Sequence, residues 1–307
     1  MVILITHFIS KTKFLIKKLL AKCLTIIGFK LYKPSYRSWI CHRIHPLLLD
    51  EKILQNQLIK RPLYKLPATI LCNPYVYTHW IPYWCGRLHD YRLDEYLRHE
   101  LKYGDTVIDV GSHVGQVTVL SACLVGEEGH VYSFEANKEL ANTIEQHCDK
   151  QGLRQVIVYP IGLGSREGKE TFYINQRHLA NSTFSPIVVQ TKQKGSFLKT
   201  DKVIIQPGDS IFTPDKFSGR VFLKIDVEGY ELETLKGLAK TLTYIDHAVI
   251  EVTPEWIKGN IGVALLFSFM HNHDFVAYNL NENGQIGARL NLESIKQQTN
   301  VLFIRKN

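Results

Sequence analysis

The chain has 307 residues, of which 45% are hydrophobic and 21% are charged, which is typical of a soluble globular protein with a sizeable core. Its net charge of +8 would suit a nucleic-acid-binding protein, but nine Lys and Arg residues precede the first acid, Asp50. The remainder is close to neutral, so no nucleic-acid partner is expected. Six scattered cysteines without a C-x-x-C pair favour reduced thiols in a cytoplasmic protein over a disulfide framework or a zinc site.

Residues 1–90 are predicted to form an N-terminal extension with a basic segment and an aromatic-rich cap. Lysines interrupt the apolar runs of residues 2–29, so a membrane-spanning helix is not expected, and the charges follow the apolar run instead of preceding it as in a secretory signal. The pattern suits a basic amphipathic helix on an anionic membrane surface. It suits equally a helix that packs its apolar face on the domain. Residues 75–96 are rich in Tyr and Trp, which suit contact with a sugar ring or the core of an irregular cap.

Residues 91–307 are predicted to form one α/β domain. Apolar runs that alternate with helical patterns predict a parallel sheet with helices on both faces. Residues 162–219 interrupt this alternation with short β-like pieces and a polar loop that could close over a ligand. Strands are predicted at 106–110, 130–134, 156–161, 221–227, 248–252, 275–280 and 301–304, and helices at 94–102, 114–124, 138–150, 230–238 and 263–271.

A glycine turn follows the first of these strands. The strand ends at Asp109, the chain turns through Gly111 and Gly115, and an apolar-faced helix begins, which together predict a socket for a nucleotide-like ligand. The spacing is G-x-x-x-G, not the G-x-G-x-x-G of dinucleotide-binding proteins. Twenty residues after Gly115, the second strand ends at Glu135, where a carboxylate can accept hydrogen bonds from both hydroxyls of a ribose. The alternative is an exposed acid that favours the start of the next helix.

Charged residues also mark the end of the fourth strand. In the stretch LKIDVEGYE, Lys224, Asp226 and Glu228 alternate with apolar residues, so they are predicted to share one side of the strand. They lie at the carboxyl edge of the sheet, where open α/β folds bind ligands. Buried charges are costly unless they pair or meet a ligand. The cluster is therefore a candidate functional site, with an internal ion pair as the structural alternative.

IDVGSHVG, SFEAN and LKIDVEGYE together resemble the FkbM family of S-adenosylmethionine-dependent methyltransferases over residues 90–305. The resemblance implies a Rossmann-like class I methyltransferase fold, with a seven-stranded sheet whose last strand is antiparallel. It implies methyl transfer from S-adenosyl-L-methionine to a hydroxyl, often on a sugar, with Glu135 at the ribose and Asp226 facing the sulfonium. His113 and Lys138 depart from the residues more common in the family. The implied cofactor-binding residues are Asp109, Gly111, Ser112, His113, Gly115, Glu135, Ala136, Asn137, Gly162 and Asp226.

The chemistry calls for a base near the acceptor, because a hydroxyl is more reactive when its proton is removed during attack. Asp226 and Glu228 are the leading candidates, with Lys224 beside them. Glu251 on the neighbouring fifth strand and His113 are further candidates. No metal is expected. The acceptor is predicted to be a sugar, a glycan or a related small molecule, and the enzyme to be cytoplasmic, with residues 1–30 at the inner face of the membrane.

Two other functions are compatible with parts of the pattern. An NAD-linked oxidoreductase would use a glycine turn and Glu135, but this turn lacks the second glycine of the dinucleotide motif, and LKIDVEGYE would have no role. A non-catalytic binding module on the same scaffold would have little reason to keep the glycine turn, Glu135 and Asp226 together.

Overall fold

The computed structural model describes residues 57–175, 182–192, 198–257 and 259–306, and the chain divides into two compact units, residues 1–91 and 92–307. In the first unit, β1 (Ile59–Pro62) pairs with β2 (Thr69–Cys72), and η1 (Tyr77–His79) precedes α3 (Trp80–Cys85). Trp84 forms a small buried cluster with Ile81 and Cys85, so part of the aromatic segment is structural. Residues 1–30, which carry the predicted membrane contact, lie outside the described residues. Within the described ranges, no helix is both long enough and apolar enough to span a membrane.

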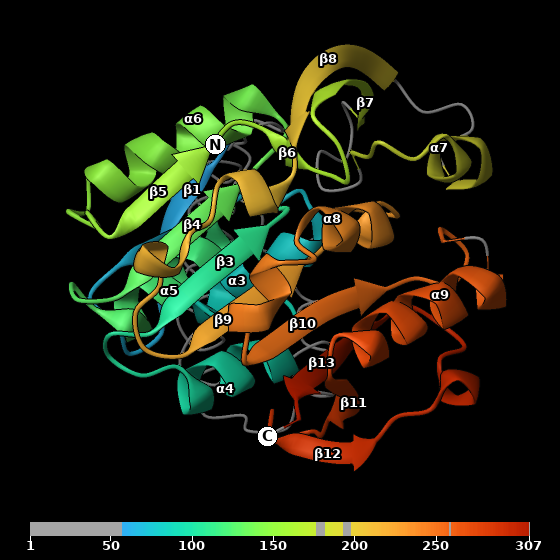
Figure 1. Cartoon of the computed structure of the whole chain (residues 1–307). Helices are drawn as coiled ribbons and strands as arrows, with labels where there is room; N and C mark the ends of the chain where they lie inside the picture. The colour runs from blue at the N-terminus through green and yellow to red at the C-terminus, as the bar shows by residue number, and fades with distance from the viewer. Residues whose placement is uncertain (1–56, 176–181, 193–197, 258, 307) are drawn as a thin grey trace, which may run out of the picture. The chain divides into compact units, whose positions relative to one another are not determined.

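The second unit is organised around a mixed sheet, which has eight strands in the part of the chain described, in the order β12-β11-β13-β10-β9-β3-β4-β5 (Figure 1). Neighbouring strands from β10 to β5 are parallel, and β13 is antiparallel between β10 and β11. This confirms the predicted fold class, and β12 adds an edge strand beyond the seven expected. The strands are β3 (Thr106–Val110), β4 (His130–Phe134), β5 (Val156–Tyr159), β9 (Val221–Ile225), β10 (His247–Val252), β11 (Phe275–Leu280), β12 (Ile286–Arg289) and β13 (Thr299–Arg305).

Helices cover both faces of this sheet. All residues of β3 and β9 are buried, as expected for strands covered on both sides. Val221, Leu223 and Ile225 of β9 belong to the core that includes residues of α8 and α9, so Lys224 turns to the opposite face. On that face the hydroxyl of Thr118 in α5 bonds Asp109. The helices are α4 (Tyr91–Glu100), α5 (Gln116–Val125), α6 (Lys138–Asp149), α8 (Glu231–Gly237) and α9 (Gly259–Asn272), with 3-10 turns η3 (Gly208–Ser210), η4 (Pro214–Lys216), η5 (Thr241–Tyr244) and η6 (Leu292–Ser294).

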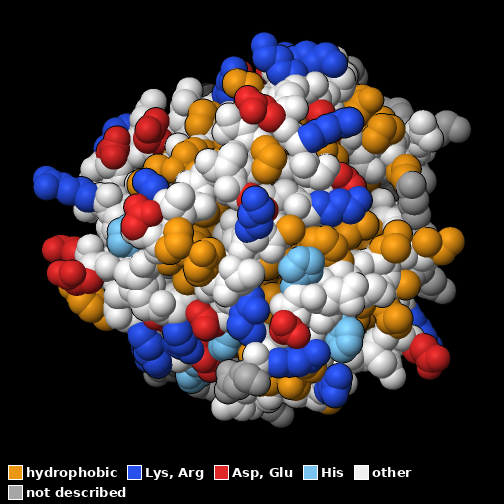
Figure 2. Space-filling view, in the orientation of Figure 1, with side chains coloured by type: hydrophobic (Ala, Val, Ile, Leu, Met, Phe, Trp, Pro, Cys, Tyr) orange, Lys and Arg blue, Asp and Glu red, His pale blue; other side chains and the backbone are white. Residues whose placement is uncertain are grey.

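Residues 162–206 include a second sheet, which in its described part has three strands in the order β6-β8-β7. It comprises β6 (Gly162–Leu163), β7 (Gly168–Asn175) and β8 (Leu198–Gln206), with α7 (Pro186–Lys192) between the last two. Phe172, Phe184, Val203 and Ile205 form its core. The strands are longer than the short pieces predicted, because residues 199–202 of β8 pair with β7 although all four are polar and exposed. On the face shown in Figure 2, acidic and basic side chains are interspersed.

Candidate active site

The turn after β3 ties together three segments of the site. The backbone N–H groups of Gly111 and Ser112 both donate to the carbonyl of Phe134, at 2.9 and 3.1 Å. Gly111 has φ +79°, and a Cβ at this position would lie 1.8 Å from the carbonyl oxygen of Asp226. Only glycine satisfies both the left-handed backbone and the close approach. The turn therefore joins the ends of β3 and β4 to the segment that follows β9.

A buried ion pair supports this turn from behind. Asp109 is 0% exposed and accepts a hydrogen bond from Thr118 Oγ1 at 2.7 Å. Lys224 Nζ lies 3.4 Å from Asp109 Oδ1 and 3.7 Å from Asp226 Oδ2, and it donates to the carbonyl of Gly111 at 2.8 Å. Burial alone would lower the pKa of Lys224, but the two carboxylates raise it above its usual value. Lys224 is therefore a charged group that holds Asp226 beside the turn.

Glu135 follows β4 and is held by backbone donors on both oxygens. Oε2 accepts from the N–H of His113 at 2.7 Å, and Oε1 accepts from the N–H of Asn137 at 2.8 Å. Burial raises the pKa of Glu135 to about 7, although both backbone hydrogen bonds oppose the shift. The Asn137 side chain instead caps α6, accepting from the N–H groups of Glu139 and Leu140 at 3.0 and 3.4 Å. The carboxylate is thus fixed in orientation while each oxygen keeps lone pairs for a further donor.

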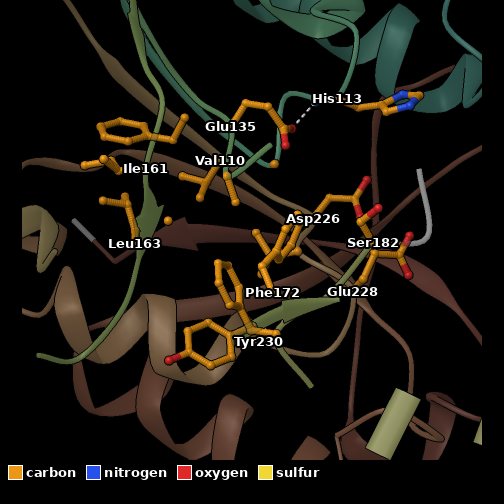
Figure 3. Close-up of a pocket in the computed structure, with 16 residues that line it drawn as sticks. Val110, His113, Glu135, Ile161, Leu163, Phe172, Ser182, Asp226, Glu228 and Tyr230 are labelled. Atoms are coloured by element: carbon orange, nitrogen blue, oxygen red, sulfur yellow. Dashed lines mark hydrogen bonds between the residues drawn. The ribbon is translucent and has the colours of Figure 1, made fainter. Parts of the chain in front are cut away.

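Gly111 of the turn, Glu135 and Asp226 meet at a cavity at the carboxyl edge of the main sheet (Figure 3). Figure 3 shows Ile161 and Leu163 on one side of the cavity and the carboxylates of Asp226 and Glu228 on the other. The cavity therefore has an apolar part and an acidic part. Its lining residues are Val110, Gly111, His113, Phe134, Glu135, Ala136, Ile161, Gly162, Leu163, Phe172, Ser182, Phe184, Asp226, Val227, Glu228 and Tyr230.

The structure divides the predicted site residues into two groups. Gly111, His113, Glu135, Ala136, Gly162, Asp226 and Glu228 line the cavity, whereas Asp109, Ser112, Gly115, Asn137 and Lys224 do not. Ser112 Oγ donates to the carbonyls of Asp109 and Phe134, at 2.9 and 3.2 Å. Gly115 has φ +77°, and a Cβ there would lie 3.0 Å from the side chain of Ile144 in α6. These residues shape the wall from behind instead of forming its surface.

Three aromatic residues that pack together at the second sheet were not among the predicted site residues. Phe172 of β7, Phe184 and Tyr230 line the cavity, and the rings of Phe184 and Tyr230 lie 5.2 Å apart. Phe172 and Phe184 lie outside the three motifs and are spaced like ordinary core residues, whereas Tyr230 lies within LKIDVEGYE but was assigned no role. The prediction that residues 162–219 could close over a ligand indicated only in general that side chains of this segment would lie near the cavity.

The acidic segment after β9 departs from the prediction in its backbone. The strand ends at Ile225, so Asp226 and Glu228 lie in a loop and not on the strand. Glu228 has φ +55°, a conformation that breaks the strand's alternation. Glu231 Oε1 accepts from the N–H groups of Val227 and Gly229, at 3.3 and 3.0 Å. The carbonyl of Glu228 accepts from Thr183 Oγ1 at 2.6 Å, so the loop is held from two sides.

Glu251 joins this loop because β9 and β10 are neighbours. Ile225 is aligned with Ile250, which places Asp226 and Glu251 side by side at the edge of the sheet. One oxygen each from Asp226, Glu228 and Glu251 lies within 4.8 Å of the others. Burial raises the pKa of both Glu228 and Glu251, and the charge of Asp226 adds to the shift. Sequence spacing showed no set of metal ligands, but the fold assembles three carboxylates.

His113 lines the cavity, but its imidazole points away from the other labelled residues in Figure 3. It has φ +53°, and its N–H is one of the donors to Glu135. Burial lowers the pKa of its imidazole to about 4, with a further contribution from the charge of Lys224. The imidazole is therefore neutral at physiological pH and a weak proton acceptor.

The family model for the methyltransferase FkbM domain matches residues 109–284 of the sequence. This match covers more than half of the chain and includes the glycine turn, Glu135 and the acidic loop. The chain belongs to the FkbM methyltransferase family. The resemblance of the three motifs is thereby confirmed.

Individual relatives of this FkbM-family chain match it over shorter spans. The hexuronic acid methyltransferase AglP of Haloferax volcanii is 27% identical over 156 residues, which cover 51% of this chain and 59% of AglP. The protein-L-isoaspartate O-methyltransferase of Ignicoccus hospitalis is 40% identical over 67 residues, 22% of this chain and 31% of that protein. The crystal structure of methyltransferase FkbM from Methylobacillus flagellatus aligns with a TM-score of 0.41 at 16% identity, covering 65% of this chain and 43% of that chain. The chain thus spans less than two thirds of the length of these relatives.

Proposed function

We propose that this protein transfers the methyl group of S-adenosyl-L-methionine to a hydroxyl of a sugar or glycan. The observation that carries the proposal is the meeting of Glu135 and Asp226 at one cavity, each at the end of a strand that bears a motif of the FkbM family. The apolar part of the cavity lies beside them. A ribose-binding acid and a second acid facing a reacting centre are the two groups that the activity needs.

The residues present fit the cofactor. Phe134 and Phe172 offer flat aromatic faces and Ile161 an apolar side chain for an adenine. Glu135 keeps lone pairs for the ribose hydroxyls, and the negative charge of Asp226 favours a sulfonium. When bound, the cofactor supplies a methyl group on a positively charged sulfur. Proximity and alignment of an acceptor oxygen then account for much of the rate acceleration.

Asp226 is the proposed base that takes the proton of the acceptor hydroxyl. Its side chain is 36% exposed and reaches the cavity, whereas Oε2 of Glu228 is buried. Lys224 holds Asp226 from behind at 3.7 Å. Base catalysis of this kind typically contributes a factor of about 10² to 10⁴ to the rate.

A sugar is the proposed acceptor because the FkbM resemblance implies one and because AglP is named for a sugar acid. We infer a cytoplasmic location, with residues 1–30 in peripheral contact with the membrane. The alternation of lysines and apolar residues in that segment supports this placement.

The proposal is tested first by calorimetry with S-adenosyl-L-methionine and, separately, with NAD. Binding of NAD alone would overturn the proposal in favour of an oxidoreductase. Methyl transfer from labelled cofactor to a panel of sugars then identifies the acceptor.

Asp226→Asn is expected to lower kcat by about 100-fold or more, and to raise the dissociation constant of the cofactor by a smaller factor, because the charge that favours the sulfonium is lost. The substitution removes the base without changing the size of the side chain. Steady-state kinetics and calorimetry on the same preparation provide the two values. An unchanged kcat would show that Asp226 is not the base.

A further inference from the structure

We propose that Asp226, Glu228 and Glu251 bind a hard divalent cation, such as Mg²⁺ or Mn²⁺, which holds the acceptor hydroxyl next to the cofactor. The proposal rests on the proposed function, because it assigns the cation to the acceptor side of the same site. It goes further by giving the three carboxylates a shared ligand.

The geometry supplies three oxygen ligands from rigid positions. One oxygen from each carboxylate lies within 4.8 Å of the other two. Opposite ligands of Mg²⁺ lie about 4.2 Å apart, so small side-chain movements would bring all three oxygens onto one ion. The alignment of β9 with β10 fixes Asp226 and Glu251, and the hydrogen bond from Thr183 fixes the backbone of Glu228. Carboxylate oxygens are the ligands that Mg²⁺, Mn²⁺ and Ca²⁺ prefer.

A separate observation indicates that this cluster lacks a ligand. Oε2 of Glu228 is buried and has no hydrogen-bond partner among the residues that the structure describes. A buried carboxylate oxygen is costly without a donor or a cation. Lys224 directs its charge to Asp109 and Asp226, at 3.4 and 3.7 Å. Glu251 accepts one hydrogen bond, from Gln298 Nε2 at 2.8 Å, so further positive charge is needed.

The cofactor's sulfonium does not account for the whole cluster. Asp226 and Glu228 line the cofactor cavity, but Glu251 does not. The three carboxylates therefore extend from the cavity toward the end of β10. A cation held between them would lie at the acidic end of the cavity, opposite Ile161 and Leu163 (Figure 3), where we place the acceptor.

The cation gives the acceptor oxygen a fixed position and a more acidic proton. The hydroxyl oxygen binds the cation, and its proton passes to the Asp226 oxygen that does not contact the ion. A bond forms between that hydroxyl oxygen and the methyl carbon as the carbon–sulfur bond breaks, with the bonding electron pair remaining on sulfur. The products are a methyl ether and a neutral thioether, and Asp226 then releases the proton to solvent.

The full-length protein is first treated with EDTA and dialysed to remove bound metal. It is then titrated with MnCl₂, and the electron paramagnetic resonance signal of free Mn²⁺ measures binding. The wild type is expected to bind Mn²⁺, and Glu251→Gln to raise its dissociation constant at least tenfold. Glu255→Gln is the matched control, because it removes an equal charge from an exposed neighbouring position. This control is expected to retain the wild-type affinity for Mn²⁺.

Two results would overturn the cation site: no binding of Mn²⁺ by the wild type at millimolar concentration, or equal affinities in the wild type and Glu251→Gln. Calorimetry with S-adenosyl-L-methionine in the presence of EDTA separates this failure from failure of the proposed function. Retained cofactor affinity in Glu251→Gln shows that the variant is folded, because Glu251 lies outside the cofactor cavity. The site would be further supported if EDTA abolishes methyl transfer by the wild type and added Mg²⁺ restores it.

Discussion

Among single residues, Glu135 gives the clearest prediction about the ligand of the cavity. Its carboxylate is 7% exposed and receives one backbone N–H on each oxygen. Because these donors fix its orientation before a ligand arrives, the proposed contact with ribose hydroxyls would need little further ordering. Its raised pKa, about 7, also makes its charge sensitive to pH near neutrality.

Glu135→Ala is expected to raise the dissociation constant of S-adenosyl-L-methionine about tenfold or more. The loss of one or two hydrogen bonds to a charged acceptor accounts for this size, since tenfold corresponds to about 1.4 kcal/mol. Calorimetry measures the constant directly. Glu139→Ala, at an exposed position in the first turn of α6, is the control and should bind as the wild type does. Wild-type affinity in the Glu135 variant would show that this residue does not bind the cofactor.

The affinity for the cofactor is expected to rise with pH through about 7. Burial raises the pKa of Glu135 to about 7, so the carboxyl is protonated below that value and must lose its proton to accept two ribose hydroxyls. The dissociation constant should therefore increase by up to about tenfold for each pH unit below 7. Calorimetry across this range tests it, with Glu135→Gln as the variant in which this dependence disappears. The same slope in both proteins would assign it to another group.

Among the elements, the turn after β3 and the loop after β9 form one unit. The N–H of Asp226 donates to the carbonyl of Val110 at 3.0 Å, and Gly111 lies against the carbonyl of Asp226. At the start of α8, Glu231 is 2% exposed and accepts two N–H groups of the loop. Displacement of either segment would therefore move Asp226 relative to the cofactor cavity.

Gly111→Ala is expected to lower the free energy of unfolding more than Gly152→Ala does. Both glycines have positive φ, +79° and +71°, but a Cβ at 111 would lie 1.8 Å from a backbone oxygen, whereas at 152 it would meet nothing within 4 Å. Gly152→Ala therefore costs only the backbone strain, about 1–2 kcal/mol. Gly111→Ala adds overpacking of about 1–3 kcal/mol. Urea denaturation compares the two, and equal losses would contradict the close approach.

For the molecule as a whole, basic charge and the methyltransferase-like domain are separated along the chain. Nine basic residues precede Asp50, and the FkbM match begins at residue 109. The N-terminal segment could thus determine where the protein is located without taking part in methyl transfer.

Deletion of residues 1–30 is expected to abolish co-sedimentation of the protein with anionic vesicles. The attraction of each basic residue near such a surface is about 1 kcal/mol, and the deletion removes six lysines together with the apolar runs between them. Vesicles of neutral lipid provide the control and should bind the full chain more weakly. Unchanged sedimentation of the truncated protein would contradict membrane contact and favour a packing role for this segment.

Local patterns were sufficient for much of the fold. The apolar runs of β3 and β4 and the glycine turn specify strand, turn and helix within a few residues, and all were predicted from that spacing. The end of β9 was predicted two residues too late. Charged and apolar residues still alternate beyond Ile225, which predicted a longer strand. The strand ends there because Glu228 adopts a left-handed backbone. Ligand contact by the predicted site residues stays a prediction, with Glu135 and Asp226 placed at the cavity.

From its residues alone, the chain could be assigned to the FkbM family and to an α/β sheet with a binding site at its carboxyl edge, because motifs and periodicity depend on near neighbours. Glu251 was a candidate base on the neighbouring strand, but only the tertiary structure fixed its register beside Asp226 and Glu228. It likewise placed Phe172, Phe184 and Tyr230 around the cavity. Contacts between distant segments are set by packing across the whole sheet, which no local spacing records.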